Sequence, residues 1–179
     1  MPARNGKTTT VANFGLVAAQ GGARVCLIDS DLRRPTLHRL FALDNNRGLT
    51  TALVEDLPFE KVAQPSRIPN LSVLTSGPLA PNPAELAGSK RMRDLLEGAY
   101  SAFDLIICDS PPVALVADGL ALAAQCDGVL LVIRSGKVAS EVGRRAADTI
   151  EAVKGRILGV ILNHVNLRRD GYYYPYYQY

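Results

Sequence analysis

The sequence contains no tryptophan and few aromatic residues outside its last eight positions. Its 179 residues include four Phe and seven Tyr, and six of the Tyr lie between positions 172 and 179. The core of the remaining chain must therefore be aliphatic. The length and a composition of 47% hydrophobic and 21% charged residues predict one globular domain and exclude collagen-like, fibrous and wholly disordered classes. We expect a folded domain over residues 1–167 and a flexible tyrosine-rich tail over 168–179.

Cysteine is scarce, and neither sign of charge dominates. Cys26, Cys108 and Cys126 show no CxxC spacing, which indicates small buried side chains in a reducing compartment. The net charge of +3 comes without a long basic run, so a dedicated nucleic-acid binder is excluded. The longest apolar runs are far below the roughly 20 residues that span a bilayer, and no signal peptide opens the chain. These absences predict a cytoplasmic protein.

Short aliphatic runs alternate with longer amphipathic stretches, as in parallel sheets whose strands are joined by helices. We expect strands at Arg24–Asp29, Leu71–Thr75, Phe103–Cys108, Gly128–Ile133 and Ile157–Asn163. Helices are expected at Lys7–Gln20, Leu49–Val54, Pro83–Tyr100, Ala114–Ala124 and Ser140–Lys154. Gly21 and Gly22 should end the first helix. The pattern predicts an α/β fold with a mainly parallel sheet.

The first predicted helix opens on Asn5-Gly6-Lys7-Thr8-Thr9, which is similar to the end of a phosphate-binding loop. Helix N-terminal amides, a Lys ammonium and a hydroxyl that reaches Mg²⁺ are the groups that a triphosphate requires. The full loop pattern needs a Gly five positions before Gly6, where this chain has Met1. Taken alone, these residues also fit an ordinary helix cap.

Two aliphatic strands deliver carboxylates at their ends. Val25–Ile28 leads into Asp29-Ser30-Asp31, and Leu105–Cys108 leads into Asp109. Ligands of parallel α/β sheets bind at this edge, where paired carboxylates hold Mg²⁺ or accept a proton. A solvated acidic turn is the alternative for either strand alone, but the order of all three elements favours a nucleotide site. Asp127, between a helix and a strand, fits a turn residue.

The last strand and the tail offer further candidates. Asn163, at the end of that strand, could hydrogen-bond an adenine, whereas His164 fits a packed or solvated loop residue. The tail fits an adhesive aromatic segment, a stacking surface for nucleic acid or sugar rings, or a row of phosphate acceptors. The candidate acceptors are Tyr172, Tyr173, Tyr174, Tyr176, Tyr177 and Tyr179.

Together these residues resemble the bacterial tyrosine kinases (BY-kinases) of the CapB, CpsD and Wzc type, which govern capsule and exopolysaccharide export. Besides GKTT, the LIDSDLRRP segment is similar to the family's second Walker motif, and LIICDSPPV is similar to its Walker B motif. Pro81–Leu86 is similar to the segment before the family's central helix, and a C-terminal tyrosine cluster is the family's most distinctive feature. The resemblance covers essentially the whole chain.

The resemblance implies a P-loop NTPase-like three-layer fold and a role for each motif residue. Lys7 would contact the β- and γ-phosphates of ATP, and Thr8 would bind Mg²⁺. Asp31 and Asp109 would complete the metal site, and Asp29 would position or deprotonate the incoming tyrosine hydroxyl. Asn5, Gly6, Lys7, Thr8, Thr9 and Asn163 would bind the nucleotide. The implied enzyme is an ATP- and Mg²⁺-dependent protein-tyrosine autokinase.

The resemblance also implies partners. We expect a homo-oligomer, possibly a ring, in which one subunit phosphorylates the tail of its neighbour, together with a cognate phosphatase. A transmembrane activator of polysaccharide export, separate or fused upstream, would hold the kinase at the inner face of the plasma membrane. No nucleic-acid partner is expected. The chain begins inside the phosphate loop, so we expect the family's first strand and upstream Glu/Arg-rich helix to be missing.

Two alternatives remain at this point. The first is a MinD/ParA-like ATPase scaffold, but that family carries a further Lys early in its phosphate loop, where this chain has Pro2. The second is a catalytically impaired regulatory module whose tail an intact relative phosphorylates.

Overall fold

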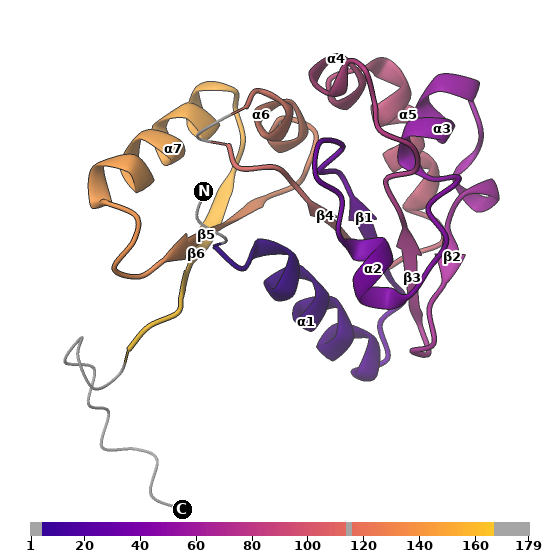
Figure 1. Ribbon diagram of the computed structural model, residues 1–179, viewed down its shortest axis with the longest axis horizontal. Helices are drawn as coiled ribbons and strands as arrows, with labels where there is room; N and C mark the ends of the chain where they lie inside the picture. The colour runs from indigo at the N-terminus through magenta and orange to yellow at the C-terminus, as the bar shows by residue number, and fades with distance from the viewer. Residues whose placement is uncertain (1–4, 114–115, 167–179) are drawn as a thin grey trace, which may run out of the picture.

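The computed structural model describes residues 5–113 and 116–166 (Figure 1). The tail and its six tyrosines therefore lie outside the described residues. The helices are α1 (Lys7–Gln20), α2 (Leu37–Phe41), α3 (Leu49–Glu55), α4 (Pro83–Ala87), α5 (Lys90–Ala99), α6 (Asp118–Ala123) and α7 (Ser140–Ala152), with the 3₁₀-helix η1 (Phe59–Lys61). The strands are β1 (Val25–Asp29), β2 (Gln64–Pro65), β3 (Leu71–Leu74), β4 (Leu105–Asp109), β5 (Val129–Arg134) and β6 (Ile157–Asn163).

The strands form two sheets, which confirms the expectation of mainly parallel pairing. β1 lies between β3 and β4 and pairs in parallel with both, and the short β2 adds an antiparallel edge. β5 and β6 form a separate parallel pair. The register places Asp29 opposite Asp109, so both strands end at the same level. Within the described residues no strand precedes α1, and no ladder joins β4 to β5.

Helices cover both faces of the larger sheet, so the fold has three layers. Alternate residues of a strand point to opposite faces, and β1 accordingly contributes to two cores. Cys26 and Ile28 pack with residues of α3, η1, α5 and α6. Val25 and Leu27 pack on the other face, against α1 and α2. Burial of all five β1 residues explains why its sequence is a continuous aliphatic run rather than an alternating one.

Two helix predictions were wrong at their boundaries. The stretch predicted as one helix over Pro83–Tyr100 is split into α4 and α5, because Gly88 ends the first and the Ser89 hydroxyl accepts a hydrogen bond from the Met92 amide to cap the second. The helix predicted from Ala114 begins at Asp118 instead. Sequence analysis also missed α2, η1 and β2, which are too short to carry a periodic signal.

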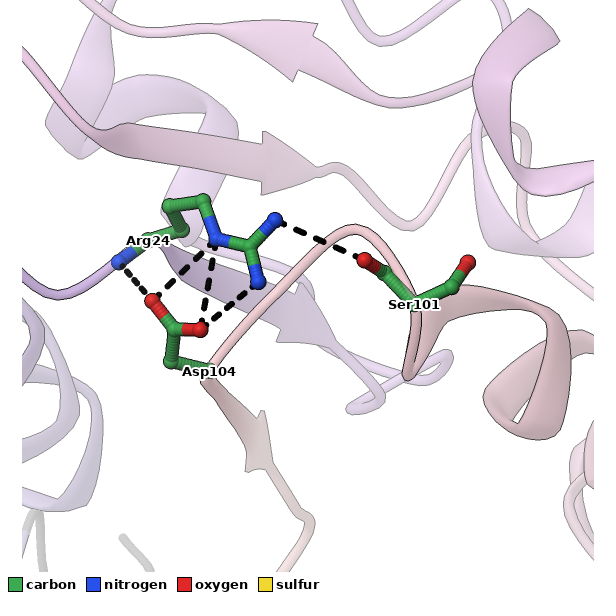
Figure 2. A network of polar contacts seen from close by, with 3 residues as sticks. All are labelled: Arg24, Ser101 and Asp104. Carbon is green, nitrogen blue, oxygen red and sulfur yellow. Dashed lines mark hydrogen bonds and ion pairs between the residues drawn. The ribbon is translucent and has the colours of Figure 1, made fainter.

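The amino ends of β1 and β4 are joined by a polar network at the surface (Figure 2). Arg24 Nη2 lies 2.7 Å from Asp104 Oδ1, and the Arg24 amide donates to Asp104 Oδ2 at 2.9 Å. A third contact runs from Arg24 Nη1 to the Ser101 carbonyl at 3.4 Å. Both charged side chains are about half exposed, 53% and 50%. This edge of the sheet therefore carries a half-exposed ion pair in which each charge has a partner.

No helix within the described residues combines the length and the apolar character needed to cross a membrane.

Candidate functional site

The phosphate-loop residues lie where α1 begins. Gly6 adopts a left-handed conformation with φ of 79°, and the Asn163 side-chain amide occupies the space that a Cβ at this position would need. Glycine is thus required both by the backbone and by this close approach. The first hydrogen bond within the helix runs from the Thr10 amide to the Gly6 carbonyl at 2.9 Å. The amides of Lys7, Thr8 and Thr9 therefore have no partner within the helix and can bind an anion.

Thr8 contacts the carboxylate that ends β4. Its hydroxyl donates to Asp109 Oδ2 at 2.5 Å, although the two residues are 101 positions apart. The Thr36 hydroxyl in turn donates to the Thr8 hydroxyl at 3.3 Å. Asp109 is buried, so this contact places a hydroxyl and a carboxylate oxygen side by side at the phosphate loop.

Asp29 ends the neighbouring strand and is fully buried. Its Oδ2 atom accepts hydrogen bonds from the Thr36 amide at 2.9 Å and the Leu37 amide at 2.8 Å, at the start of α2. The short helix α2 therefore anchors one oxygen of this carboxylate. The role of Thr36 could not be predicted from the sequence, because its contact with Asp29 comes from the backbone amide and leaves no residue-type signal.

The two buried carboxylates are poorly neutralised. Burial raises the pKa of Asp29 to about 7, with further repulsion from Asp109 and Asp31, although the amides of Leu37 and Thr36 oppose the shift. Burial also raises the pKa of Asp109 to about 6, against the opposing effects of the Thr8 hydrogen bond and the Lys7 charge. Within the described residues, Asp29 Oδ1 and Asp109 Oδ1 have no hydrogen-bond partner. A cluster of this kind can take up a cation or protons.

The set of donors fits magnesium. Mg²⁺ prefers oxygen ligands and is usually held by one or two carboxylates together with the phosphates of the substrate. The Thr8 hydroxyl and the unpartnered Asp109 Oδ1 supply such oxygens beside the phosphate loop. The described residues contain no cluster of three or more His, Cys, Asp or Glu able to bind a metal.

Comparisons with known proteins identify the family. A family model described as AAA domain matches residues 5–162. The chain is 45% identical over 171 residues to the tyrosine-protein kinase YwqD of Bacillus subtilis, covering 94% of this chain and 72% of the relative. It also superposes on the kinase domain of the Escherichia coli tyrosine kinase ETK with a TM-score of 0.87 and 36% identity, covering 90% of this chain and 64% of that one. The chain belongs to the bacterial tyrosine-kinase family.

Membership of this family makes the chain a protein-tyrosine kinase with a P-loop nucleotide-binding fold. The cell-division ATPase MinD of Pyrococcus furiosus has the same fold, with a TM-score of 0.77, but is only 22% identical over 90% of this chain and 68% of its own. That likeness supports the fold alone. The alternative of a MinD-like scaffold therefore has no support beyond the architecture that the two families share.

The remaining predicted site residues of the tyrosine kinase lie around this cluster. Asp31 is half-buried in the loop after β1, and its Oδ1 accepts a hydrogen bond from the Arg34 amide at 3.0 Å. Thr9 is exposed in the first turn of α1. The Asn163 amide donates to the Asn5 carbonyl at 3.0 Å, and its oxygen accepts from the His164 amide at 2.8 Å. Asn163 thus braces the phosphate loop, and its contact with adenine stays a prediction.

Proposed function

We propose that this tyrosine kinase transfers the γ-phosphoryl group of ATP to tyrosines of the C-terminal segment in a neighbouring copy. In this proposal residues 1–167 form the catalytic domain, and residues 168–179 form its substrate. The observation that carries the proposal is the convergence of the phosphate loop, the Thr8 hydroxyl and two buried carboxylates with unpartnered oxygens. This is the set of groups that positions a triphosphate and neutralises the charge of its transfer.

Each residue has a separate task in this proposal. Lys7 and the first amides of α1 bind the β- and γ-phosphates. Thr8 and Asp109 hold Mg²⁺, with Asp31 from the facing loop, and the bound ion would stabilise the charge of the transferring phosphoryl group. These residues act by positioning and by charge, which is how most of the rate of phosphoryl transfer is obtained.

Asp29 is the residue that we assign to the acceptor hydroxyl. One of its oxygens is held by the α2 amides, and Oδ1 is buried without a hydrogen-bond partner, so in this proposal the tyrosine hydroxyl enters the site to become that partner. A pKa raised to about 7 suits a general base that works near neutral pH. Asp29 would thus orient the tyrosine hydroxyl toward the γ-phosphorus and receive its proton during transfer.

The place where β6 ends supports the role of the tail as the substrate. β6 ends at Asn163, whose amide contacts the phosphate loop, so the segment that leads to Tyr172 starts beside the site. We further propose, from the family resemblance, a ring-shaped homo-oligomer, a transmembrane activator at the inner face of the membrane, a cognate phosphatase and a role in capsule or exopolysaccharide export.

A mixing experiment tests both the activity and its direction. The donor variant keeps Lys7 and has all six tail tyrosines changed to Phe, and the acceptor variant carries Lys7→Met with the native tail. We expect ATP and Mg²⁺ to produce phosphotyrosine on the acceptor only when the donor is present, as measured by mass spectrometry. The control Lys90→Met removes an ammonium from α5, where the side chain is 84% exposed, and should leave phosphorylation unchanged.

Three results would contradict parts of this proposal. Phosphotyrosine in the native chain but not in the mixture would show that the tail is phosphorylated within one molecule. Phosphorylation of Lys7→Met alone would remove Lys7 from the mechanism. Absence of ATP binding by calorimetry in the native chain would leave only the regulatory module.

A further inference from the structure

Arg33, in the loop after β1, forms an ion pair with Asp118 of α6 across the site. Arg33 Nε lies 2.7 Å from Asp118 Oδ2, and Arg33 Nη2 donates to Asp118 Oδ1 at 3.2 Å. The two residues are 85 positions apart in the sequence. Two parallel contacts between a guanidinium and a carboxylate fix both the distance and the relative orientation of the groups. In Figure 1 the loop after β1 and the start of α6 lie side by side, in agreement with this contact.

Asp118, the acidic partner of this ion pair, is held in place by burial and packing. Its side chain is only 2% exposed, whereas that of Arg33 is 45% exposed. The next residue, Gly119, lies against the segment that follows Asp109, since a Cβ there would be 3.1 Å from the Pro111 carbonyl oxygen and 2.8 Å from Val113 Cγ1. The first turn of α6 is thus packed on the continuation of the strand that ends in Asp109.

Arg33, the basic partner of the ion pair, follows Asp31 by two residues. The loop leaves the sheet at Ser30, whose amide donates to the Asp109 carbonyl at 2.9 Å. Beyond that bond, the Leu32 side chain is buried in the core, and the Arg33 side chain ties the loop to α6. Asp31 therefore lies between two attachments, one to the end of β4 and one to α6.

Repulsion between like charges gives this second attachment a function. Asp29 and Asp109 lie opposite each other in the strand register, and Asp31 follows Asp29 by two residues, so three carboxylates gather at this edge of the sheet. Such repulsion favours movement of the half-buried Asp31 loop away from Asp109. The Arg33–Asp118 contact opposes that movement without occupying any oxygen of Asp31.

We propose that Arg33 is a positioning residue of the kinase, whose ion pair with Asp118 holds the Asp31 loop toward Asp109 for binding of Mg²⁺. The inference rests on the proposed function, because it assumes that Asp31 and Asp109 serve one Mg²⁺. Groups that orient metal ligands from outside the coordination shell typically change metal affinity or activity by about 10–100-fold when removed. Lysine keeps the charge of arginine but lacks its planar pair of donors.

The test measures the Mg²⁺ concentration that gives half-maximal binding of a fluorescent ADP analogue, and in parallel the half-maximal concentration for tail phosphorylation. We expect Arg33→Ala to raise both values about 10-fold or more, and Arg33→Lys to raise them less. Asp118→Asn should reproduce the effect of Arg33→Ala, and the double variant should be no worse than either single change. Arg24→Ala is the matched control, because it breaks an Arg–Asp pair of similar geometry at the opposite edge (Figure 2).

The outcomes separate a positioning role from a structural one. A lowered unfolding midpoint in Arg33→Ala with an unchanged Mg²⁺ requirement would overturn the inference, as would a value within twofold of the native one. If Arg33→Ala does not fold, Arg33→Lys and Asp118→Asn decide in the same way. Native protein that binds the analogue with Mg²⁺ but forms no phosphotyrosine would refute the proposed kinase reaction. The Mg²⁺ dependence of analogue binding would then decide whether Arg33 has the positioning role. Native protein that binds no nucleotide would refute both.

Discussion

The two ends of β1 and β4 differ in how their charges are compensated. At the amino edge, Arg24 and Asp104 form an ion pair in which both side chains are about half exposed. At the carboxyl edge, Asp29 and Asp109 face each other in register, are buried, and each keeps one oxygen without a hydrogen-bond partner in the described structure. The same two strands thus have paired charges at one end and buried, unpaired carboxylates at the other. The unpaired carboxylates are the ones suited to bind a ligand.

The largest expected contrast is in catalysis. Asp109→Asn keeps a side-chain oxygen for the Thr8 hydroxyl but removes the negative charge that would bind the metal, so we expect the rate of tail phosphorylation to fall by about 10²–10³-fold. Its free energy of unfolding at pH 7 should not fall, because the substitution removes a poorly compensated buried charge.

Asp104→Asn makes the same chemical change at the amino edge. We expect its phosphorylation rate to stay within about twofold of the native rate, because Asp104 lies at the opposite end of β4 from the site. Initial rates at saturating ATP and Mg²⁺ measure both variants. Equal losses in the two variants would show that the division between the edges is wrong.

The second contrast is in pH dependence, measured by urea unfolding without nucleotide. The pKa values of Asp29 and Asp109 are raised from 3.8 to about 7 and about 6, so between about pH 4 and 7 the folded state binds more protons than the unfolded state. Their contribution to the free energy of unfolding therefore falls as the pH rises through this window, in total by an amount on the order of a few kcal/mol. Asp29→Asn should flatten the upper part of this slope.

Asp104 should give the opposite sign. Its hydrogen bonds with Arg24 hold its pKa at about 2, below the ordinary 3.8. Its stabilising contribution is thus present above about pH 4 and is lost as the pH falls toward 2. Asp104→Asn should remove this loss at low pH and leave the slope between pH 4 and 7 unchanged. If Asp104→Asn changed the pH dependence of the free energy of unfolding between pH 4 and 7, the assignment of that slope to Asp29 and Asp109 would be wrong.

The smallest expected effect is on stability at neutral pH. Arg24→Ala removes an exposed ion pair, and exposed pairs contribute little, so its urea midpoint should shift only slightly and less at high salt. Asp104→Ala should shift the midpoint more, because Asp104 also accepts the backbone amide of Arg24. A larger shift in Arg24→Ala than in Asp104→Ala would mean that the guanidinium, rather than the backbone contact, holds this edge.

Much of this site could be predicted from the sequence because it is built on buried strands. Continuous aliphatic runs placed β1 and β4, and the rule that parallel strands end at one edge brought Asp29 and Asp109 together, as the register confirms. The first helix was predicted with its observed bounds. These features depend on local pattern and on a general rule of topology.

The contacts between loops could not be predicted in the same way. Arg33 and Asp118 meet across 85 residues, and nothing in the sequence around either specifies the other. The hydrogen bond from the Asn163 amide to the Asn5 carbonyl joins residues 158 positions apart and was likewise not predicted, while the contact of Asn163 with adenine stays a prediction. Side-chain partners of this kind follow from the packed structure rather than from periodicity. The break before Ser89, by contrast, had a signal, since Gly followed by Ser is a common helix end and cap.

The bond between Asn163 and Asn5 also bears on the order in which the protein becomes competent during synthesis. The phosphate loop is made first, but it is braced by a residue 158 positions later and by Asp109 through Thr8. A growing chain therefore lacks a complete nucleotide site until β6 has been made and docked. Only eight residues separate Asn163 from Tyr172. The site and the first tyrosine of its proposed substrate are thus completed almost together, which gives a nascent chain little opportunity to bind ATP before its tail exists.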